Sequence, residues 1–313
     1  MDVSIIIVSF NTKDLLKQCI ESIYEYTKDI DFEIIVVDNA SSDGSQQMVK
    51  EVFPTVTLIE SPENLGFGKA NNLGSKYAKG EFLFFLNSDT IFIENSIKKL
   101  YDFFLENEKV LKIGVLGGLL VDEKGNQNTA WHQFSTPNTI NNENIIFIIN
   151  TLTHKLSSII TIITKKIKKA SHSSQAKEIN KMYLAVDFVL GADMLMRKDL
   201  FDTVHGFDEC YFMYFEETDL QLNLFRKGYK NYIYNSTKII HLEGASSGGG
   251  KLMSNKQRII FHKSKINYMK KFFCKQYLFF KFLDKIALNL QIFSKKYTKD
   301  ENRFYVKEIS KNY

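Results

Sequence analysis

The sequence predicts an α/β protein, in which a doubly wound, mostly parallel sheet with a smaller antiparallel part is followed by a helical C-terminal tail. Three observations support this prediction. Four apolar runs in the first 90 residues alternate with amphipathic segments, an order that builds parallel sheets through right-handed crossovers. These runs are apolar at nearly every position, as in strands that helices cover on both faces. Beyond residue 250 the chain becomes aromatic and basic, with helical periodicity.

The first half is expected to repeat strand and helix four times. Asn11 and Thr12 offer an N-cap for the first helix, whose apolar positions run from Leu15 to Ile23. The expected strands are 3–10, 32–37, 56–59 and 82–86, and the later helices are 46–52, 64–78 and 93–106.

The second half changes character. Residues 113–121 resemble a strand pair joined at Gly117 and Gly118, and residues 135–181 resemble a variable insert with an amphipathic helix at 145–169. A helix from Thr218 and closing strands complete the domain. The closing strands are expected at 229–234 and 237–241. We therefore expect one domain of residues 1–250, in halves 1–112 and 113–250, and a tail of residues 251–313.

The composition is that of a globular protein with a full core: 313 residues, 44% hydrophobic and 25% charged. We expect a reducing cytoplasmic location, because the three cysteines lie far apart without metal-type spacing. The sequence also shows no signal peptide and no apolar stretch long enough to span a bilayer. From residue 251 on, the sequence contains 16 Lys and Arg but only 4 Asp and Glu. The net charge of the tail is therefore +12, and that of the remainder is −7, which together give the total of +5. This asymmetry predicts an anionic partner for the tail.

Polar residues follow two of the expected strands. The fourth strand stops at Asn87, Ser88 and Asp89, and ligands of open α/β sheets bind beyond such carboxyl ends. Asp89 suits a hard divalent cation and a diphosphate, or alternatively caps the next helix. Asp38 ends the second strand, where it suits a nucleobase imide or a ribose hydroxyl, or alternatively is a turn residue. Asn71, near the start of its helix, can add a donor and an acceptor beside it.

Two features of the second half add candidates. Glu216 and Glu217 lie at the start of the helix expected near Thr218, after aromatic residues such as Tyr214 and Phe215, which can desolvate a carboxylate and raise its pKa, as a general base requires. The helix macrodipole accounts for part of this acidic cluster. His241 follows a strand and precedes a glycine-rich loop, where it can ligate a metal, although a lone histidine is more often structural.

Seven motifs occur in order: Val-Ser-Ile-Ile-Ile-Val-Ser-Phe-Asn, Val-Val-Asp-Asn-Ala-Ser-Ser-Asp-Gly, Asn-Leu-Gly-Phe-Gly-Lys-Ala-Asn-Asn, Leu-Asn-Ser-Asp, Gly-Ala-Asp, Glu-Glu-Thr-Asp-Leu and His-Leu-Glu-Gly. Together they resemble the family 2 inverting glycosyltransferases, and within these the bacterial rhamnosyltransferase-like branch. The resemblance covers about residues 3 to 250. It implies a GT-A type fold, with a nucleotide-binding half at 1–112 and an acceptor half at 113–250.

The resemblance also implies roles for single residues. Asp89 and His241 match metal-binding positions for Mn²⁺ or Mg²⁺, and Glu217 matches the catalytic base. Two departures are present: Asn87 replaces the first acid of an Asp-x-Asp motif, and Glu217 replaces an Asp, which leaves Glu216 as an alternative base. The residues expected to bind the nucleotide-sugar are Ser9, Asn11, Asp38, Asn71, Asn87, Ser88, Gly191, Ala192 and Asp193.

The leading hypothesis is a metal-dependent, inverting hexosyl- or rhamnosyltransferase. It would move sugar from a UDP- or dTDP-sugar to a hydroxyl of a lipid-linked saccharide in cell-surface polysaccharide synthesis. The tail suits an anionic membrane, so a peripheral position on the inner face of the cell membrane is expected. A packed helix with solvated lysines is the alternative, and nucleic acid is not an expected partner. A sugar nucleotidyltransferase and an inactive nucleotide-sugar-binding subunit stay open as other functions.

Overall fold

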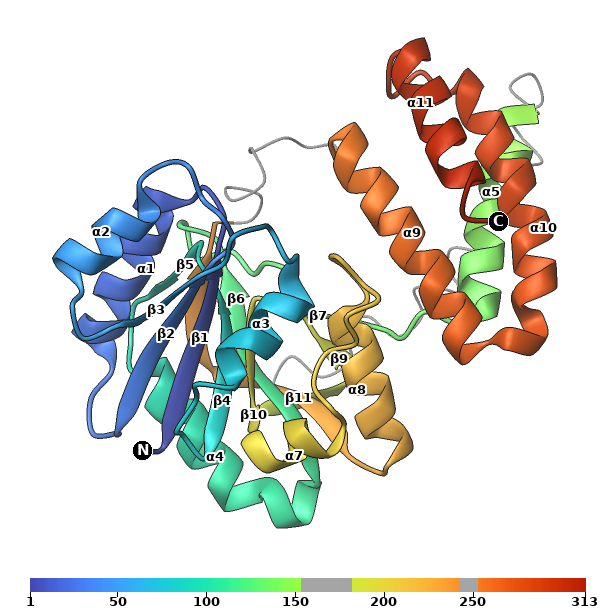
Figure 1. Cartoon of the computed structure of the whole chain (residues 1–313). Coiled ribbons are helices and arrows are strands. Elements are labelled where there is room, and N and C mark those ends of the chain that lie inside the picture. The colour runs from blue at the N-terminus through green and yellow to red at the C-terminus, as the bar shows by residue number, and fades with distance from the viewer. Residues whose placement is uncertain (153–181, 243–252) are drawn as a thin grey trace. The chain divides into compact units, whose positions relative to one another are not determined.

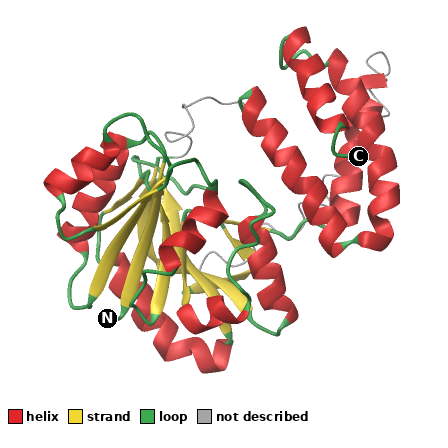
Figure 2. Ribbon diagram, in the orientation of Figure 1, coloured by secondary structure: helices red, strands yellow, loops and turns green. Residues whose placement is uncertain are grey.

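The computed structural model describes residues 1–152, 182–242 and 253–313 (Figure 1). The chain divides into two units, one of residues 1–134 and 180–251 and one of residues 135–179 and 252–313. The first is α/β, and the described part of the second is helical (Figure 2). The start of the expected insert therefore groups with the tail, whereas the sequence suggested that it belongs to the preceding domain.

A nine-stranded sheet runs through the first unit. Its strands are β1 Val3–Ser9, β2 Phe32–Asp38, β3 Thr57–Glu60, β4 Phe82–Asn87, β5 Thr90–Phe92, β6 Ile113–Val121, β8 Tyr183–Val186, β10 Asp193–Arg197 and β11 Lys230–His241. Their order is β3-β2-β1-β4-β10-β6-β11-β5, with β8 paired to β11. Strands β1 to β4 pair in parallel, whereas β10 is antiparallel to β4 and β6. A separate pair joins β7 (Trp131–His132) and β9 (Phe188–Val189).

Helices cover both faces of this sheet, as the apolar runs predicted. The helices of the unit are α1 Lys13–Tyr26, α2 Ser45–Val52, α3 Phe67–Ser75, α4 Ser96–Leu111, α7 Lys198–Thr203 and α8 Glu216–Arg226. On β4, Phe82 packs edge-on against Phe104 of α4, with ring centroids 5.0 Å apart. Phe85 points to the other face of the sheet, where its ring centroid lies 5.0 Å from that of Phe201 of α7. Successive side chains of one strand therefore enter two cores.

Three details differ from the sequence-based expectation. The segment 113–121 is one strand, β6, because glycine serves close packing there: a Cβ on Gly117 would lie 2.5 Å from Val189 Cγ1. The two closing strands are a single strand, β11, with an irregular register. A short strand, β5, follows Asp89, so the next helix begins later than expected, at Ser96.

The second unit packs helices around a core of its own. They are α5 Pro137–Leu152, α9 Asn255–Phe272, α10 Cys274–Leu290, the 3-10 turn η2 Gln291–Phe293 and α11 Lys299–Ser310. Ile140 of α5, Ile266 of α9, Phe280 of α10 and Ile309 of α11 are buried together. The helix expected at 145–169 begins earlier than predicted, and its second part lies outside the described residues. Among the helices described, none is both long and apolar enough to cross a membrane.

Candidate active site at the carboxyl edge of the sheet

The parallel strands of the first half end together at one edge of the sheet, which we call the carboxyl edge. Ser9, the last residue of β1, is paired with Asp38, the last residue of β2. One residue earlier on β1, Val8 is paired with Asn87 of β4. The two strand ends that the sequence singled out therefore lie side by side across β1.

The second half of the chain reaches the same edge through two antiparallel pairings. Strand β10 runs opposite to β4, so its first residue, Asp193, is paired with Leu86 near the end of β4. The last residue of β11, His241, is paired with Thr90, directly after Asp89. Sheet topology alone thus brings polar residues from both halves of the sequence to one edge.

A chain of buried hydroxyl groups ties the ends of β1 and β4 together. Thr12 Oγ1 lies 3.0 Å from Ser9 Oγ and 3.0 Å from Ser88 Oγ. Thr12 stands at the N-cap of α1 but makes no side-chain capping bond, because its hydroxyl is used between the strands. Since these hydroxyls already have protein partners, contacts of Ser9 and Ser88 with a nucleotide-sugar stay predictions.

Asp38 keeps one carboxylate oxygen available. Its Oδ1 accepts hydrogen bonds from the Ser41 amide at 2.9 Å and from Gln46 Nε2 at 2.7 Å. Its Oδ2 is buried and has no hydrogen-bond partner among the described residues. A buried acceptor without a donor is costly, so this oxygen is suited to a ligand that donates, such as a nucleobase imide or a ribose hydroxyl.

Two predicted asparagines have structural partners. Asn11 has a left-handed backbone (φ 55°), and its Oδ1 accepts a hydrogen bond from the Ser42 amide at 2.8 Å, which joins the loops after β1 and β2. Asn71 is buried in α3, where its Nδ2 donates to the Phe67 carbonyl at 3.1 Å. Their expected contacts with a nucleotide stay predictions.

Asp89 and His241 form the candidate metal-binding pair. His241 Nε2 lies 3.3 Å from Asp89 Oδ1, and the two side chains are 12% and 1% exposed. Asn95, not Asp89, stands at the N-cap of α4, so the helix-capping alternative is wrong. No group of three or more His, Cys, Asp or Glu suited to a metal occurs among the described residues. One carboxylate and one imidazole fit Mn²⁺ or Mg²⁺ when waters and substrate phosphates complete the shell.

Asp193 is a fully buried carboxylate beside the first half's strand ends. Its Oδ2 accepts a hydrogen bond from the Gly118 amide at 2.5 Å, and its Oδ1 has no partner among the described residues. Burial raises the pKa of this carboxyl well above its usual range, against the opposing effect of the Gly118 bond. The preceding residues also belong to this edge: the Asn87 amide donates to the Ala192 carbonyl at 3.0 Å, and a Cβ on Gly191 would lie 3.1 Å from Phe67 Cζ.

Glu216 and Glu217 begin α8, and this helix start is held against the first turn of α3. Tyr214 and Phe215 both have left-handed backbones (φ 70° and 71°), a strained arrangement that turns the chain sharply into α8. The Phe67 amide donates to the Phe212 carbonyl at 2.9 Å. A Cβ on Gly68 would lie 3.3 Å from Glu216 Cβ, a tighter contact than usual, so glycine lets this acid pack closely against α3.

The start of α3 belongs to the carboxyl edge, which places the acid pair there as well. Asn39, directly after β2, donates from Nδ2 to the Gly66 carbonyl at 2.9 Å and accepts from the Leu65 amide at 3.1 Å. Asn72 accepts a hydrogen bond from the Phe207 amide at 2.9 Å, which fastens the loop that leads toward α8. Neither role was predicted from the sequence. Their only signal in the sequence was that each directly follows a predicted site residue, Asn39 after Asp38 and Asn72 after Asn71.

Both glutamates have raised pKa values. Burial raises the pKa of Glu216 well above its usual range, and the charge of Glu217 adds to this effect. Burial also raises the pKa of Glu217. Each keeps one carboxylate oxygen without a hydrogen-bond partner among the described residues. Glu217 is half-buried whereas Glu216 is 3% exposed, so Glu217 is the more exposed of the two residues, and the unpaired oxygen of each is buried.

A cavity of about 470 Å³ lies elsewhere in the first unit. Its lining includes Arg197, which is paired with Phe82 at the start of β4, and Ile113 at the start of β6. It therefore opens at the edge opposite to Asp38 and Asp89. Arg197 there is engaged by Glu108 and Glu81, and none of the predicted site residues lines this cavity.

Residues 4–204 match the family model of glycosyl transferase family 2. The chain is 34% identical over 124 residues to a poly(ribitol-phosphate) beta-glucosyltransferase of Bacillus spizizenii, a match that covers 38% of this chain and 20% of that protein. It is 25% identical over 226 residues to an N-acetylglucosaminyl-diphospho-decaprenol L-rhamnosyltransferase of Mycobacterium tuberculosis, covering 69% of this chain and 68% of that protein. A third relative, the poly(ribitol-phosphate) beta-N-acetylglucosaminyltransferase TarP of Staphylococcus aureus, is 33% identical over 127 residues, covering 39% of this chain and 38% of that protein. The chain therefore matches less than half of the Bacillus spizizenii and Staphylococcus aureus proteins.

Solved structures agree with these similarities. The mannosyltransferase PcManGT from Pyrobaculum calidifontis, in complex with GDP-Man and Mn²⁺, superposes with a TM-score of 0.55 at 15% identity and covers 99% of this chain and 86% of that one. S. aureus TarS 1–349 in complex with UDP gives a TM-score of 0.51 at 14% identity, covering 100% of this chain and 89% of that one. These likenesses confirm the predicted GT-A type α/β fold.

Proposed function

Because the chain belongs to glycosyl transferase family 2, we propose that it transfers a sugar from a nucleoside diphosphate sugar to a hydroxyl group, with inversion at the anomeric carbon. The observation that supports this proposal most is the gathering of acids from both halves at the carboxyl edge. Asp38 and Asp89 follow parallel strands, Asp193 begins β10, and the Glu216–Glu217 pair lies against the start of α3.

The first-half residues are proposed to hold the donor nucleotide and its diphosphate. Asp38 Oδ2 is the acceptor for the nucleobase or ribose, because it is buried and has no hydrogen-bond partner among the described residues. Asp89 and His241 would hold Mn²⁺ or Mg²⁺, and Asn87 contributes no charge to this site. The bound ion would neutralise charge that develops on the leaving nucleoside diphosphate.

Glu217 is proposed as the general base. Its carboxylate accepts the proton of the acceptor hydroxyl while that oxygen forms a bond to the anomeric carbon and the bond to the diphosphate breaks. Burial raises its pKa, and a raised pKa makes a carboxylate a stronger proton acceptor. Glu216, packed over Gly68, keeps the helix start in place beside the donor site.

The donor is proposed to be a UDP- or dTDP-sugar and the acceptor a lipid-linked saccharide in the synthesis of a cell-surface polysaccharide. The names of similar proteins support this acceptor class, since they include a poly(ribitol-phosphate) beta-glucosyltransferase and an N-acetylglucosaminyl-diphospho-decaprenol L-rhamnosyltransferase. A lipid-linked acceptor lies at the inner face of the cell membrane, which is where we propose that the protein acts.

A test is incubation with a panel of UDP- and dTDP-sugars, with and without Mn²⁺, followed by detection of released nucleoside diphosphate. Glu217→Gln should lower turnover about 10²- to 10⁴-fold while UDP affinity stays within about twofold of wild type. Glu106→Gln, an exposed change on α4, is the matched control. Turnover of Glu217→Gln near that of the control would remove Glu217 as the base. Release of pyrophosphate from UTP and a sugar phosphate would instead indicate a nucleotidyltransferase, and donor binding without turnover an inactive binding subunit.

A further inference from the structure

The helical unit exposes an apolar stripe along α10 and the turn that follows. Leu278, Phe279 and Phe282 are 75%, 58% and 62% exposed, and Phe293 of η2 is 71% exposed. Positions 275, 278, 279, 282 and 285 recur at intervals of three and four residues, so they share one side of the helix. We define the α10 face as Lys275, Leu278, Phe279, Phe282, Lys285, Ile292 and Phe293.

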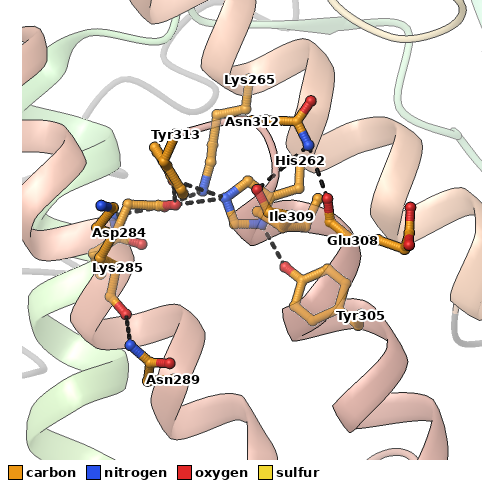
Figure 3. Close-up of polar contacts among 11 residues, drawn as sticks. His262, Lys265, Asp284, Lys285, Asn289, Tyr305, Glu308, Ile309, Asn312 and Tyr313 are labelled. Carbon is orange, nitrogen blue, oxygen red and sulfur yellow. Dashed lines mark hydrogen bonds and ion pairs between the residues drawn. The ribbon is translucent and has the colours of Figure 1, made fainter.

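The opposite side of α10 is committed to the unit's interior. Asp284 accepts hydrogen bonds from Lys265 Nζ at 2.7 Å and from Asn144 Nδ2 at 3.1 Å, and it also contacts His262 and Tyr313 (Figure 3). The side chains of Phe280, Ala287 and Leu288 are buried on the same side. Because these contacts fix the rotation of α10, the α10 face must point away from the core.

The charges around this face have one sign. From Cys274 to Thr298 the sequence holds five lysines and a single acid, Asp284, which is buried. Lys275 and Lys285 are exposed on the α10 face, and Lys295 and Lys296 follow its end. Exposed aromatic and aliphatic side chains between lysines are the composition of helices that lie in the interface of a membrane.

We propose that the α10 face docks on an anionic lipid bilayer, with its aromatic side chains at the headgroup level and its lysines on the lipid phosphates. A second copy of the chain fits the same face poorly. In a twofold contact the same surface of both copies meets, so the lysines would face lysines, and the segment has no exposed acid to pair with them.

This proposal revises the membrane-binding pattern that the sequence suggested. Within the basic aromatic tail, Tyr268 and Phe280 are buried, and Lys265 is bound to Asp284 inside the unit. These residues hold the helices together. The lipid-binding role falls instead to α10 and η2, and it does not depend on the proposed transferase activity.

The experiment is co-sedimentation of the full chain with vesicles of phosphatidylcholine alone and of phosphatidylcholine with phosphatidylglycerol. Wild type should bind the anionic vesicles only, and binding should weaken in 0.5 M NaCl because salt screens charge. Phe279→Ser with Phe282→Ser should weaken binding at least about tenfold, and Lys275→Glu with Lys285→Glu at least about fivefold per lysine. Tyr77→Ser with Val110→Ser, and Lys76→Glu with Lys124→Glu, make the same exposed changes in the other unit and should leave binding unchanged.

Circular dichroism and thermal melting establish that every variant is folded, and UDP binding without vesicles reports separately on the donor site. Failure of wild type to bind anionic vesicles at low salt would overturn the proposal, whatever the variants do. Equal losses in the α10-face variants and in their controls would overturn it too. So would a dimer in lipid-free solution that Phe279→Ser with Phe282→Ser dissociates, because a second copy would then be the occupant.

Discussion

Replacing Asp193 by Asn should change stability and donor binding in opposite directions. The two side chains have nearly the same shape, and the amide oxygen can keep the hydrogen bond from Gly118. The change removes a charge from a fully buried site in which one carboxylate oxygen has no partner among the described residues. A group in that situation destabilises the folded protein at neutral pH.

The direction of the change in stability follows from the pKa of Asp193. Burial raises the pKa of Asp193 in the folded protein, so between the unfolded value of 3.8 and the raised value the folded chain binds more protons. Stability therefore falls as pH rises through this window, and Asp193→Asn removes that loss. A gain of about 1 kcal/mol at pH 7 is expected, because the buried charge is lost but the new amide nitrogen stays without a partner and keeps part of the penalty of about 1–3 kcal/mol for such a group. In a domain of this size the gain raises Tm by about 2–4 °C per kcal/mol.

Donor binding should weaken, because Asp193 Oδ1 is our candidate acceptor for a sugar hydroxyl. Hydrogen bonds to a charged group contribute about 1.5–3 kcal/mol, so the Kd of the sugar donor should rise about ten- to a hundredfold. The Kd of UDP, which lacks the sugar, should stay unchanged. Calorimetric titration with both ligands and thermal melts from pH 5 to 8 measure these effects. A destabilised Asp193→Asn protein with unchanged donor affinity would show instead that Asp193 is a structural residue.

Three further predictions concern the acid pair and the helical unit. Burial raises the pKa of Glu217, so kcat should fall as pH drops through a value above 4.5, and a rate that is constant down to pH 4.5 would contradict its role as base. Gly68→Ala puts a Cβ 3.0 Å from Phe207 Cβ and 3.3 Å from Glu216 Cβ. We therefore expect the free energy of unfolding to fall by about 1–3 kcal/mol and kcat to fall about tenfold. An unaltered kcat in the folded variant would contradict a role of this packing in placing Glu216. Burial and the nearby Lys265 charge lower the pKa of His262 to about 4, below its ordinary 6.5. The helical unit should therefore keep its full free energy of unfolding above pH 6.5 and lose about 3 kcal/mol of it as pH falls to 4. Hydrogen exchange of α9 can measure this loss. His262→Gln should remove that loss, and an unchanged pH dependence in this variant would contradict it.

The parallel half of the fold was predictable because local pattern and tertiary environment agree there. Strand β4 is apolar at every position up to Asn87 because helices cover both its faces, and its carboxyl end is marked by the first polar residues. The side-by-side ends of β1, β2 and β4 then follow from parallel pairing alone. Predictions based on this pattern placed Asp38 and Asp89 on the correct edge.

The second half was harder because its signals are ambiguous in sequence. Gly117 and Gly118 suggest a turn, yet they lie inside β6, where Val189 and Asp193 leave no room for side chains. Strand β5 has three residues, too few for a periodic pattern, although it is the strand that brings His241 beside Asp89. Contacts of this kind depend on distant segments and leave no local trace.

In the candidate site, too, some residues were predictable from the sequence and others were not. Acids at strand ends and at a helix start were visible, since carboxylates at such places are few and chemically distinctive. The residues that position them were not, because Thr12, Asn39 and Asn72 look like ordinary capping or loop residues. Each acts through a hydrogen bond to a segment far away in the sequence, which only the folded chain reveals.

The central claim is that a divalent cation held by Asp89 and His241 joins a nucleoside diphosphate at the carboxyl edge. Calorimetric titration of UDP with and without Mn²⁺ tests it most directly, in wild type, Asp89→Asn and His241→Ala. Mn²⁺ should strengthen UDP binding by wild type about tenfold or more, Asp89→Asn should abolish this gain, and His241→Ala should reduce it. UDP affinity that is the same with and without Mn²⁺ in wild type, or a full Mn²⁺ effect in folded Asp89→Asn protein, would contradict it.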